Sequence, residues 1–417
     1  MREVLFRVRA DLAAQASDRY PRLSFDLVEG DESFDVRLEV PDVPGLTVDL
    51  GCEGPDAWCG WSGGARRSFV VTRDDATPGY VPGVRAGRWA VVLGLHTVPA
   101  AGAEVTVRVR VPAVEAVDHG PDAAPVVRRV RSSNRDLPAP PGLRWYAGDT
   151  HAHSLHSDGA LSLSELANEG VASGLDFLCV TDHNTVSHHR LLDKVARRHG
   201  ITLVAGQEVT THRGHANAFG RIGFIDFRCP AQEWARAVAE RGGLLSVNHP
   251  TSGDCAWLHP GSAPAGVEIV HGSWYGDPID RAPLAWLAER SPDAVLLGGG
   301  DFHDRDTPLR PGAPTTWVAA ESADEDAILA ALIAGRTTMT TGATWTADGV
   351  RPDLLGTPVL IREGDRLLAL TAGGLVLVDR DGLRRLVTGA EAPFEAPLTR
   401  GPYWLEDADR RVLALCR

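Results

Sequence analysis

Imidazole and carboxylate side chains gather in one part of this 417-residue chain, because thirteen of its fifteen histidines lie between His151 and His303. Many of these polar residues directly follow apolar runs such as DFLCVT and DAVLLGGG. Imidazole and carboxylate ligands together suit zinc, iron or manganese, and several carboxylates indicate more than one metal ion. The polar residues at the ends of apolar runs are His151, His153, Asp182, His183, Glu208, His249, Asp301 and His303.

The spacing within the first motif, HAHSLHSDG, supports a metal site. His151 and His153 are two residues apart, so an extended backbone places both rings on one face. Asp158 follows a turn at Ser157 to Gly159 and can fold back to the same centre.

Each of the other motifs, taken singly, has a purely structural alternative. Asp182 could cap a helix, Glu208 could pair with Arg213, and NHP could form a turn. Their joint occurrence after separate apolar segments favours a shared site.

The elements that would position these residues change in kind along the chain. Residues 1–117 alternate apolar and polar side chains between Gly/Pro clusters, which predicts an antiparallel β-sandwich. Residues 118–144 are rich in Pro and Arg and are predicted to be a linker. Residues 145–343 repeat a strand–turn–helix rhythm, which predicts a β/α barrel or an open parallel sheet whose strand ends meet on one face. Residues 344–417 return to short strands and are predicted to be a small β-rich unit.

Composition excludes several classes of protein. We find no apolar run of the ~18 residues that a membrane span needs, and a net charge of −13 disfavours binding to extended nucleic acid. The first residues show no secretion signal, so we expect a cytoplasmic protein. Six cysteines without a CxxC pair argue against a zinc ribbon or a dense disulfide framework. No GxSxG or GxxxxGK[ST] motif supports a serine hydrolase or a P-loop enzyme.

The chain from about Trp145 to Gly342 resembles the PHP (polymerase and histidinol phosphatase) superfamily of metallohydrolases. The motifs HAHSLHSDG, VTDHN, GQEVTTHRGHANAFG, NHP and GDFH occur in the family's order. The EVTT and GHANAFG segments, with CGWSGGARRSF and ATPGYVPG upstream, look most like the carbaryl-hydrolase-like CehA/McbA branch.

This resemblance implies a distorted (β/α)7 barrel that holds two to three divalent transition-metal ions (Mn, Fe or Zn), usually as a trinuclear cluster. It implies that Glu208 bridges two metals and that Glu208 and Asp301 hold a metal-bridging hydroxide. The implied metal ligands are His151, His153, Asp158, His183, Glu208, His215, His249, Asp301 and His303.

Residues outside the implied ligand set receive other expectations. Asp182 is expected to orient a ligand imidazole. Surface or packing roles are expected for the histidines that match no family motif, namely His156, His188, His189, His199, His212 and His259. Candidate substrate contacts are Arg213, Asn184, Asn248 and His271.

The leading functional hypothesis is a metal-dependent phosphoesterase (EC 3.1) acting on a small phosphomonoester or phosphodiester. Three divalent ions, three carboxylates and one hydroxide leave a charge of about +2, which attracts a small anionic substrate. One alternative is hydrolysis of a carboxyl ester, carbamate or amide by the same cluster. Another is a non-catalytic, metal-loaded binding scaffold. The sequence leaves the oligomeric state open.

Overall fold

The computed structural model describes residues 1–121 and 123–417, so residue 122 of the predicted linker 118–144 lies outside the described residues. The chain forms two compact units, and both are discontinuous in sequence. Unit 1 comprises residues 1–121, 153–162 and 182–190, and unit 2 comprises residues 123–152, 163–181 and 191–417. The four-part division expected from the sequence remains a prediction.

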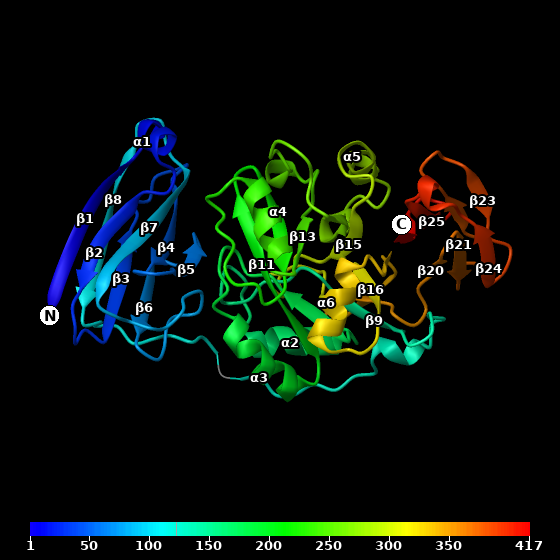
Figure 1. Cartoon of the computed structure of the whole chain (residues 1–417), viewed down its shortest axis with the longest axis horizontal. Coiled ribbons are helices and arrows are strands. Elements are labelled where there is room, and N and C mark those ends of the chain that lie inside the picture. Colours follow the sequence, from blue (N-terminus) through cyan, green and yellow to red (C-terminus); the bar gives the residue numbers. More distant parts are fainter. Residues whose placement is uncertain (122) are drawn as a thin grey trace. The chain divides into compact units, whose positions relative to one another are not determined.

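Unit 1 contains two four-stranded antiparallel sheets, coloured blue to cyan in Figure 1. The first sheet has the order β1 (Arg2–Ala10), β8 (Ala103–Val111), β3 (Ser33–Glu39) and β6 (Ser68–Thr72). The second has the order β2 (Arg22–Leu27), β7 (Gly87–Thr97), β4 (Thr47–Glu53) and β5 (Trp58–Gly63). One short helix, α1 (Leu12–Ser17), follows β1.

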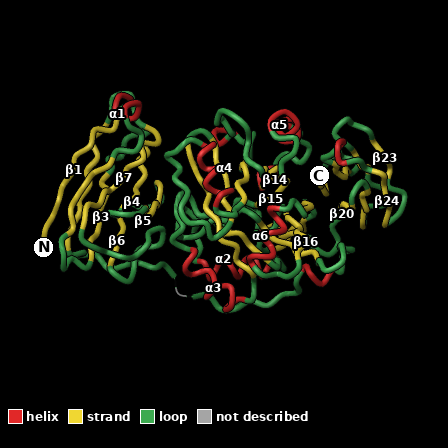
Figure 2. Tube along the Cα trace, viewed as in Figure 1, coloured by secondary structure: helices red, strands yellow, loops and turns green. Residues whose placement is uncertain are grey.

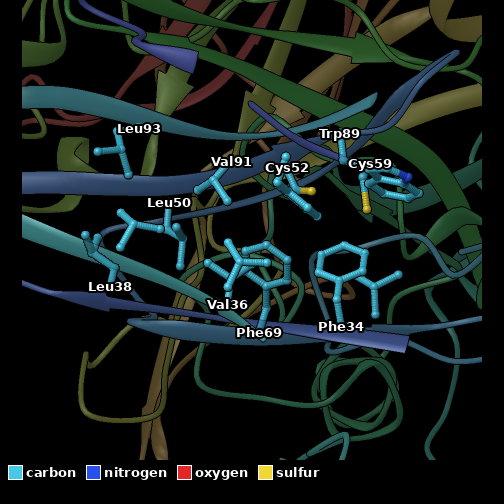
Figure 3. Packing of buried hydrophobic residues seen from close by; sticks show 14 of the residues in the cluster. Phe34, Val36, Leu38, Leu50, Cys52, Cys59, Phe69, Trp89, Val91 and Leu93 are labelled. Atoms are coloured by element: carbon cyan, nitrogen blue, oxygen red, sulfur yellow. The ribbon is translucent and has the colours of Figure 1, made fainter. Parts of the chain in front are cut away.

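The alternating apolar residues of unit 1 form a core between these sheets. Figure 3 shows Phe34 and Val36 of β3 facing Trp89 and Val91 of β7. The ring centroids of Phe34 and Trp89 lie 5.1 Å apart in an edge-to-face arrangement. Because strand side chains alternate between the two faces of a sheet, the period-two pattern of the sequence puts one set of residues inside.

Two loops from the later part of the sequence complete unit 1 and are tied to its sheets. The Arg66 guanidinium donates to the Leu155 carbonyl and, at 3.1 Å, to the Ser157 carbonyl. The Gly79 amide donates to His156 Nδ1 (3.2 Å), and the Thr185 hydroxyl donates to the Gly79 carbonyl (2.7 Å). The loops at 153–162 and 182–190 are therefore held by the connections from β5 to β6 and from β6 to β7.

Unit 2 is built on a 13-stranded sheet with helices along its length (Figure 2). Its first seven strands in spatial order are β15 (Val295–Gly299), β14 (Gly266–His271), β13 (Leu244–Val247), β12 (Gly214–Phe219), β11 (Thr202–Thr211), β10 (Phe177–Val180) and β9 (Arg144–Asp149). The other six are β16 (Thr315–Ala320), β17 (Thr337–Thr340), β26 (Val412–Cys416), β25 (Tyr403–Glu406), β22 (Val376–Val378) and β23 (Arg384–Leu386). Mixed α/β structure with substantial β content is thereby confirmed, whereas closure into a seven-stranded barrel stays a prediction.

Helices alternate with strands in unit 2, in keeping with the strand–turn–helix rhythm of residues 145–343. They are α2 (Leu163–Ala172), α3 (His189–His199), α4 (Ala231–Glu240), α5 (Ala282–Arg290) and α6 (Glu325–Ile333), with short 3₁₀ turns η1 (Ser132–Arg135), η2 (Gly253–Cys255), η3 (Gly272–Tyr275) and η4 (Leu398–Arg400). Ile328 and Leu332 of α6 pack with Phe177, Val204 and Phe219 of the sheet in one buried cluster. One buried face of α6 thus covers apolar strands of the sheet.

The sheet of unit 2 is not all parallel, because β12 runs antiparallel to both β11 and β13. Only His212 and Arg213 separate β11 from β12, and so short a connection permits a hairpin but no parallel crossover. The strand–turn–helix rhythm does not reveal this hairpin. Its register places Glu208 opposite Asn217 and His215 opposite Thr210, which puts Glu208 and His215 on the same face.

The ends of β15 and β9 approach one another through side-chain hydrogen bonds and one isolated bridge. The Thr150 and Thr316 hydroxyls donate to the Gly298 carbonyl at 3.1 Å and 2.7 Å. A parallel bridge joins Ala152 to Phe302. These contacts bring the segment after β9 next to the segment after β15, although the two segments are about 150 residues apart.

The last strands of the chain join the same sheet through pairing of β17 with β26. Small sheets flank it, formed by β18 (Ala343–Thr346) with β19 (Gly349–Pro352) and by β20 (Val359–Glu363), β21 (Arg366–Leu370) and β24 (Glu391–Glu395). Among the described residues, no helix is both long and apolar enough to cross a membrane.

We predict that Arg66→Ala loosens the loop at 153–162. The variant loses the hydrogen bonds that the Arg66 guanidinium donates to the Leu155 and Ser157 carbonyls. Because these bonds hold the loop, we expect about tenfold faster amide hydrogen exchange at Leu155 and Ser157. Arg73→Ala, at an exposed ion pair with Glu32, is the matched control and should leave these amides unchanged. Equal exchange in the two variants would show that Arg66 does not hold the loop.

Candidate metal centre

Glu208 lies at the middle of a group of imidazoles in unit 2. Its Oε1 atom is 3.1 Å from His215 Nδ1, 3.4 Å from His151 Nε2 and 3.6 Å from His249 Nε2. The Asn248 amide donates to the same oxygen at 2.7 Å. Ligand atoms of Glu208, His215 and His249 all lie within 4.8 Å of one another, as a shared metal requires.

His151 connects this group to two further carboxylates. Its Nε2 atom is 3.1 Å from Asp301 Oδ1, and its Nδ1 atom is 3.0 Å from Glu268 Oε1. Ligand atoms of His151, Glu208 and Asp301 also lie within 4.8 Å of one another. Glu268 thus binds the far nitrogen of the ring, the arrangement by which a carboxylate orients a metal-binding imidazole.

The charges of this group favour bound cations. Burial opposes protonation of His151, but the carboxylates of Asp301, Glu268 and Glu208 outweigh it and raise the pKa of His151 well above its ordinary value. Burial likewise opposes protonation of His249, and its acidic neighbours, Glu208 first, raise its pKa. Positive charge is therefore stabilised at this position, either as a proton or as a metal ion.

A second group of ligands lies in unit 1, on the two loops held by Arg66 and Gly79. The rings of His153 and His183 stack with centroids 4.3 Å apart, and His183 Nε2 is 3.4 Å from Asp158 Oδ1. Ligand atoms of these three residues lie within 4.8 Å of one another. In the chain, Ala152 alone separates His153 from His151 of the first group.

His303 belongs to unit 2 and is near Asp301. Its Nδ1 atom is 2.8 Å from the Asp301 carbonyl oxygen and 3.7 Å from Oδ1. An Nδ1–H donated to the carbonyl would leave Nε2 as the lone-pair nitrogen available to a metal. The structure therefore gathers the predicted ligands into one group within each unit.

The backbone is strained at three of the predicted motifs. The backbone φ angles of His249, Asp301 and Asn184 are 27°, 53° and 51°. Residues other than glycine rarely adopt positive φ angles. Such conformations cost on the order of 1–3 kcal/mol each and cluster at functional sites. At NHP and GDFH the strained residue is itself a predicted ligand.

Asp182 lies beside the ligand His183 in the chain, and it binds a neighbouring loop. Its carboxylate accepts hydrogen bonds from the Ser154 amide (2.8 Å), the Ser154 hydroxyl (2.7 Å) and the Ser157 hydroxyl (2.7 Å). His188 Nδ1 is 3.3 Å away. The expectation that Asp182 orients a ligand imidazole is untested, whereas its role in fixing the 154–157 segment is direct.

The histidines without a family role occupy packing or surface positions. His156 is buried, which lowers its pKa to about 3 and keeps it neutral, and it bonds to Gly79 and Ser187. His199 bonds to Ser164 and Asn168. Burial also lowers the pKa of His259, to about 4, whereas His212 is exposed.

The four candidate substrate contacts have different surroundings. Arg213 is exposed and donates to the Leu258 carbonyl, and the Asn184 carbonyl accepts from Trp58 Nε1 (3.1 Å). Asn248 is buried and holds Glu208, which makes it a positioning residue. His271 retains the most direct place at the site, because its Nε2 is 3.3 Å from Asp301 Oδ2.

Two buried carboxylates near the site escape the sequence analysis. Glu268 accepts a hydrogen bond from the His249 amide (3.0 Å) in addition to its contact with His151. Asp149 accepts from the amides of His151, Gly300 and Gly312, and burial raises its pKa to about 6. The sequence feature that could have identified them is an acidic residue in an apolar run. Glu268 lies inside VEIV, and Asp149 stands at the end of WYAGD.

The donor set fits divalent metal ions. Buried carboxylates need compensating charge, and the ion pairs of Glu208 and Asp301 within unit 2 are made with histidines rather than with arginine or lysine. His249 Nδ1 is buried and has no hydrogen-bond partner among the described residues. Mixed nitrogen and oxygen donors of this kind suit zinc, iron and manganese.

Comparison with curated proteins gives a match to a short part of the chain. A 5'-3' exoribonuclease from Haemophilus influenzae is 38% identical over 64 residues, which are 15% of this chain and 23% of the relative. The chain thus spans about a quarter of the length of that curated relative.

Solved structures give lower similarity. A two-domain protein from Bacteroides vulgatus, described as containing a predicted PHP-like metal-dependent phosphoesterase, aligns over 70% of this chain and 92% of its own with 17% identity and a TM-score of 0.41. An amidohydrolase from Chromobacterium violaceum, solved with bound sulfate and no metal, aligns over 37% and 87% with 18% identity and a TM-score of 0.27.

The family comparison covers the segment that carries most of the predicted ligands. Residues 149–251 match the model of the PHP domain, and this range includes His151, Glu208 and His249. Asp301 and His303 lie beyond it. The chain therefore contains a PHP domain, and the two ligand groups described above lie in and immediately after it.

Proposed function

We propose that this protein is a metal-dependent hydrolase, specifically a phosphoesterase whose two ligand groups serve one multinuclear cluster. The observation that carries the proposal is the group around Glu208, where one buried carboxylate oxygen lies within 3.6 Å of three imidazole nitrogens. The link of His151 to His153 through Ala152 supports a common cluster for both groups. Glu208 is the candidate bridging ligand.

The protein's own residues would prepare this centre in three ways. Glu268 fixes the ring of His151, Asn248 fixes the carboxylate of Glu208, and Asp182 fixes the loop that carries His153 and Asp158. Bound divalent ions would lower the pKa of water to about 7 and polarise the phosphoryl oxygens of a substrate. No serine or cysteine nucleophile is needed.

A small anionic substrate is the partner that this arrangement favours. Three divalent ions would exceed the charge of the carboxylates among the nine predicted ligands, and the excess positive charge would bind phosphate oxygens. His271, whose Nε2 is 3.3 Å from Asp301 Oδ2, is a further polar group near this position and a candidate donor to a substrate oxygen.

The metal content of the purified protein tests the cluster directly. We expect two or three transition-metal ions per chain, loss of activity on chelation, and little recovery with magnesium alone, because imidazole ligands prefer softer metals. Elemental analysis after reconstitution with manganese, iron or zinc is the measurement. Fewer than two equivalents under all three conditions would exclude a multinuclear site.

Glu268→Gln is expected to weaken metal binding about 10- to 100-fold without changing any predicted ligand. The glutamine amide carries no negative charge with which to stabilise the His151 ring in its orientation. Loss of a carboxylate that binds a metal-ligating imidazole typically lowers metal affinity by this factor. Titration with a metal-sensitive dye measures the affinity. Glu240→Gln, at an exposed position on α4, is the control, and equal affinities in the two variants would contradict the assigned role.

A matched panel of substrates separates phosphoester from carboxyl-ester chemistry. With one aryl leaving group throughout, the phosphate monoester or diester should exceed the acetate and the carbamate in kcat/KM, because the positive centre stabilises a charged substrate more. Inorganic phosphate should inhibit competitively. A tenfold advantage for acetate or carbamate, about 1.4 kcal/mol in transition-state free energy, would instead establish the carboxyl-ester alternative.

A further inference from the structure

A cavity of about 770 Å³ lies in unit 2 immediately after the strand that carries His271. Its wall includes three aromatic side chains, Trp274, Tyr275 and Trp345, together with Pro308 and Leu309. The volume is in the range of small-molecule sites, which are concave and mostly apolar with a few polar groups. None of the predicted metal ligands lines it.

Hydrogen bonds connect this cavity to the candidate metal centre. His271 Nε2 lies 3.3 Å from Asp301 Oδ2, and His271 Nδ1 lies 2.9 Å from the hydroxyl of Ser273, which lines the cavity. Gly272 also lines the cavity and packs closely on Gly300. A Cβ added to Gly272 would lie 2.5 Å from the Gly300 carbonyl oxygen. A substrate held at Asp301 could therefore extend into the cavity past His271.

The composition of the wall indicates a ligand with an aromatic ring. Trp345 stands on the β18–β19 hairpin with 77% of its surface exposed, although a side chain of this size is normally covered. Trp274 and Tyr275 add two further aromatic residues to the same wall. A planar ring in the cavity would cover Trp345 and make offset or edge-to-face contacts with aromatic side chains of the wall.

The wall itself is well held. The Tyr275 hydroxyl donates to the Thr341 carbonyl at 3.0 Å, which joins the segment after β14 to the segment after β17. Val350, opposite Trp345 in the hairpin, is buried, and its backbone amide donates to the Pro308 carbonyl. The hairpin that presents Trp345 is thus fixed from beneath, and the indole can be removed without opening the core.

We propose that this cavity is a specificity site that binds the aromatic portion of a phosphoester whose phosphate occupies the metal centre. The inference rests on the proposed function for the position of the phosphate, whereas recognition of the ring rests on the cavity alone. The substrate class is then an aryl phosphoester, and contact with the ring raises the affinity for the substrate without taking part in the chemical step.

Non-hydrolysable phosphonates test the proposal without turnover. We expect metal-loaded protein to bind 4-methoxyphenylphosphonate at least tenfold more tightly than methylphosphonate in a calorimetric titration. Trp345→Ala should lower this preference to about twofold while the affinity for methylphosphonate stays the same, and Trp345→Phe should restore most of it. Leu386→Ala, at another exposed apolar residue of unit 2, is the control and should change neither value.

The possible failures separate the cavity from the metal centre. Equal binding of the two phosphonates by the wild-type protein, or an equal loss of both in Trp345→Ala, would overturn the proposed ring site. If neither phosphonate binds, the phosphoesterase assignment is wrong. Saturation-transfer NMR with neutral 4-methoxyphenol on metal-free protein then tests separately whether the cavity binds an aromatic ring. Saturation transfer to 4-methoxyphenol that is present in the wild-type protein and disappears in Trp345→Ala supports the ring site. Absence of saturation transfer in the wild-type protein refutes it.

Discussion

Glu208 has almost no contact with solvent, and imidazoles of His151, His215 and His249 surround its carboxylate. Burial of an uncompensated carboxylate costs several kcal/mol, so positive charge is needed at this point in the fold. The β11–β12 hairpin supplies one imidazole, and the segments after β9 and β13 supply the others. The sheet of unit 2 is thus organised around a charge that only cations can neutralise.

Further buried groups keep this arrangement in place. Glu268 and Asp149 accept hydrogen bonds from the backbone of His249, His151 and Gly300, and they fix the turns at the strand ends. The left-handed conformations at His249 and Asp301 are held against their intrinsic cost by these contacts and by neighbouring strands. Preorganised ligands of this kind lose little freedom when they bind metal.

The N-terminal sheets hold the two loops that carry the predicted metal ligands of unit 1. Arg66 and Gly79 bind the segments that carry His153, Asp158 and His183, so the early part of the chain is more than a separate module that precedes the PHP domain. The chain after β17 contributes to unit 2, where the β18–β19 hairpin presents Trp345 at the aromatic cavity. The β-rich segments thus supply loop support and a candidate specificity surface.

The sequence by itself determined the residues capable of metal chemistry and the main helices and strands, because apolar periodicity and the motifs HAH, TDHN, NHP and GDFH are local properties of the chain. Only the tertiary structure decided the partners of those residues. Glu268 reads as one acidic residue within an apolar strand, and its contact with His151 spans 117 positions. The antiparallel β12, the tethering of His156 to Gly79 and the aromatic cavity likewise depend on segments far apart in sequence. Such pairings are set by packing and charge compensation in three dimensions, which a one-dimensional pattern does not encode.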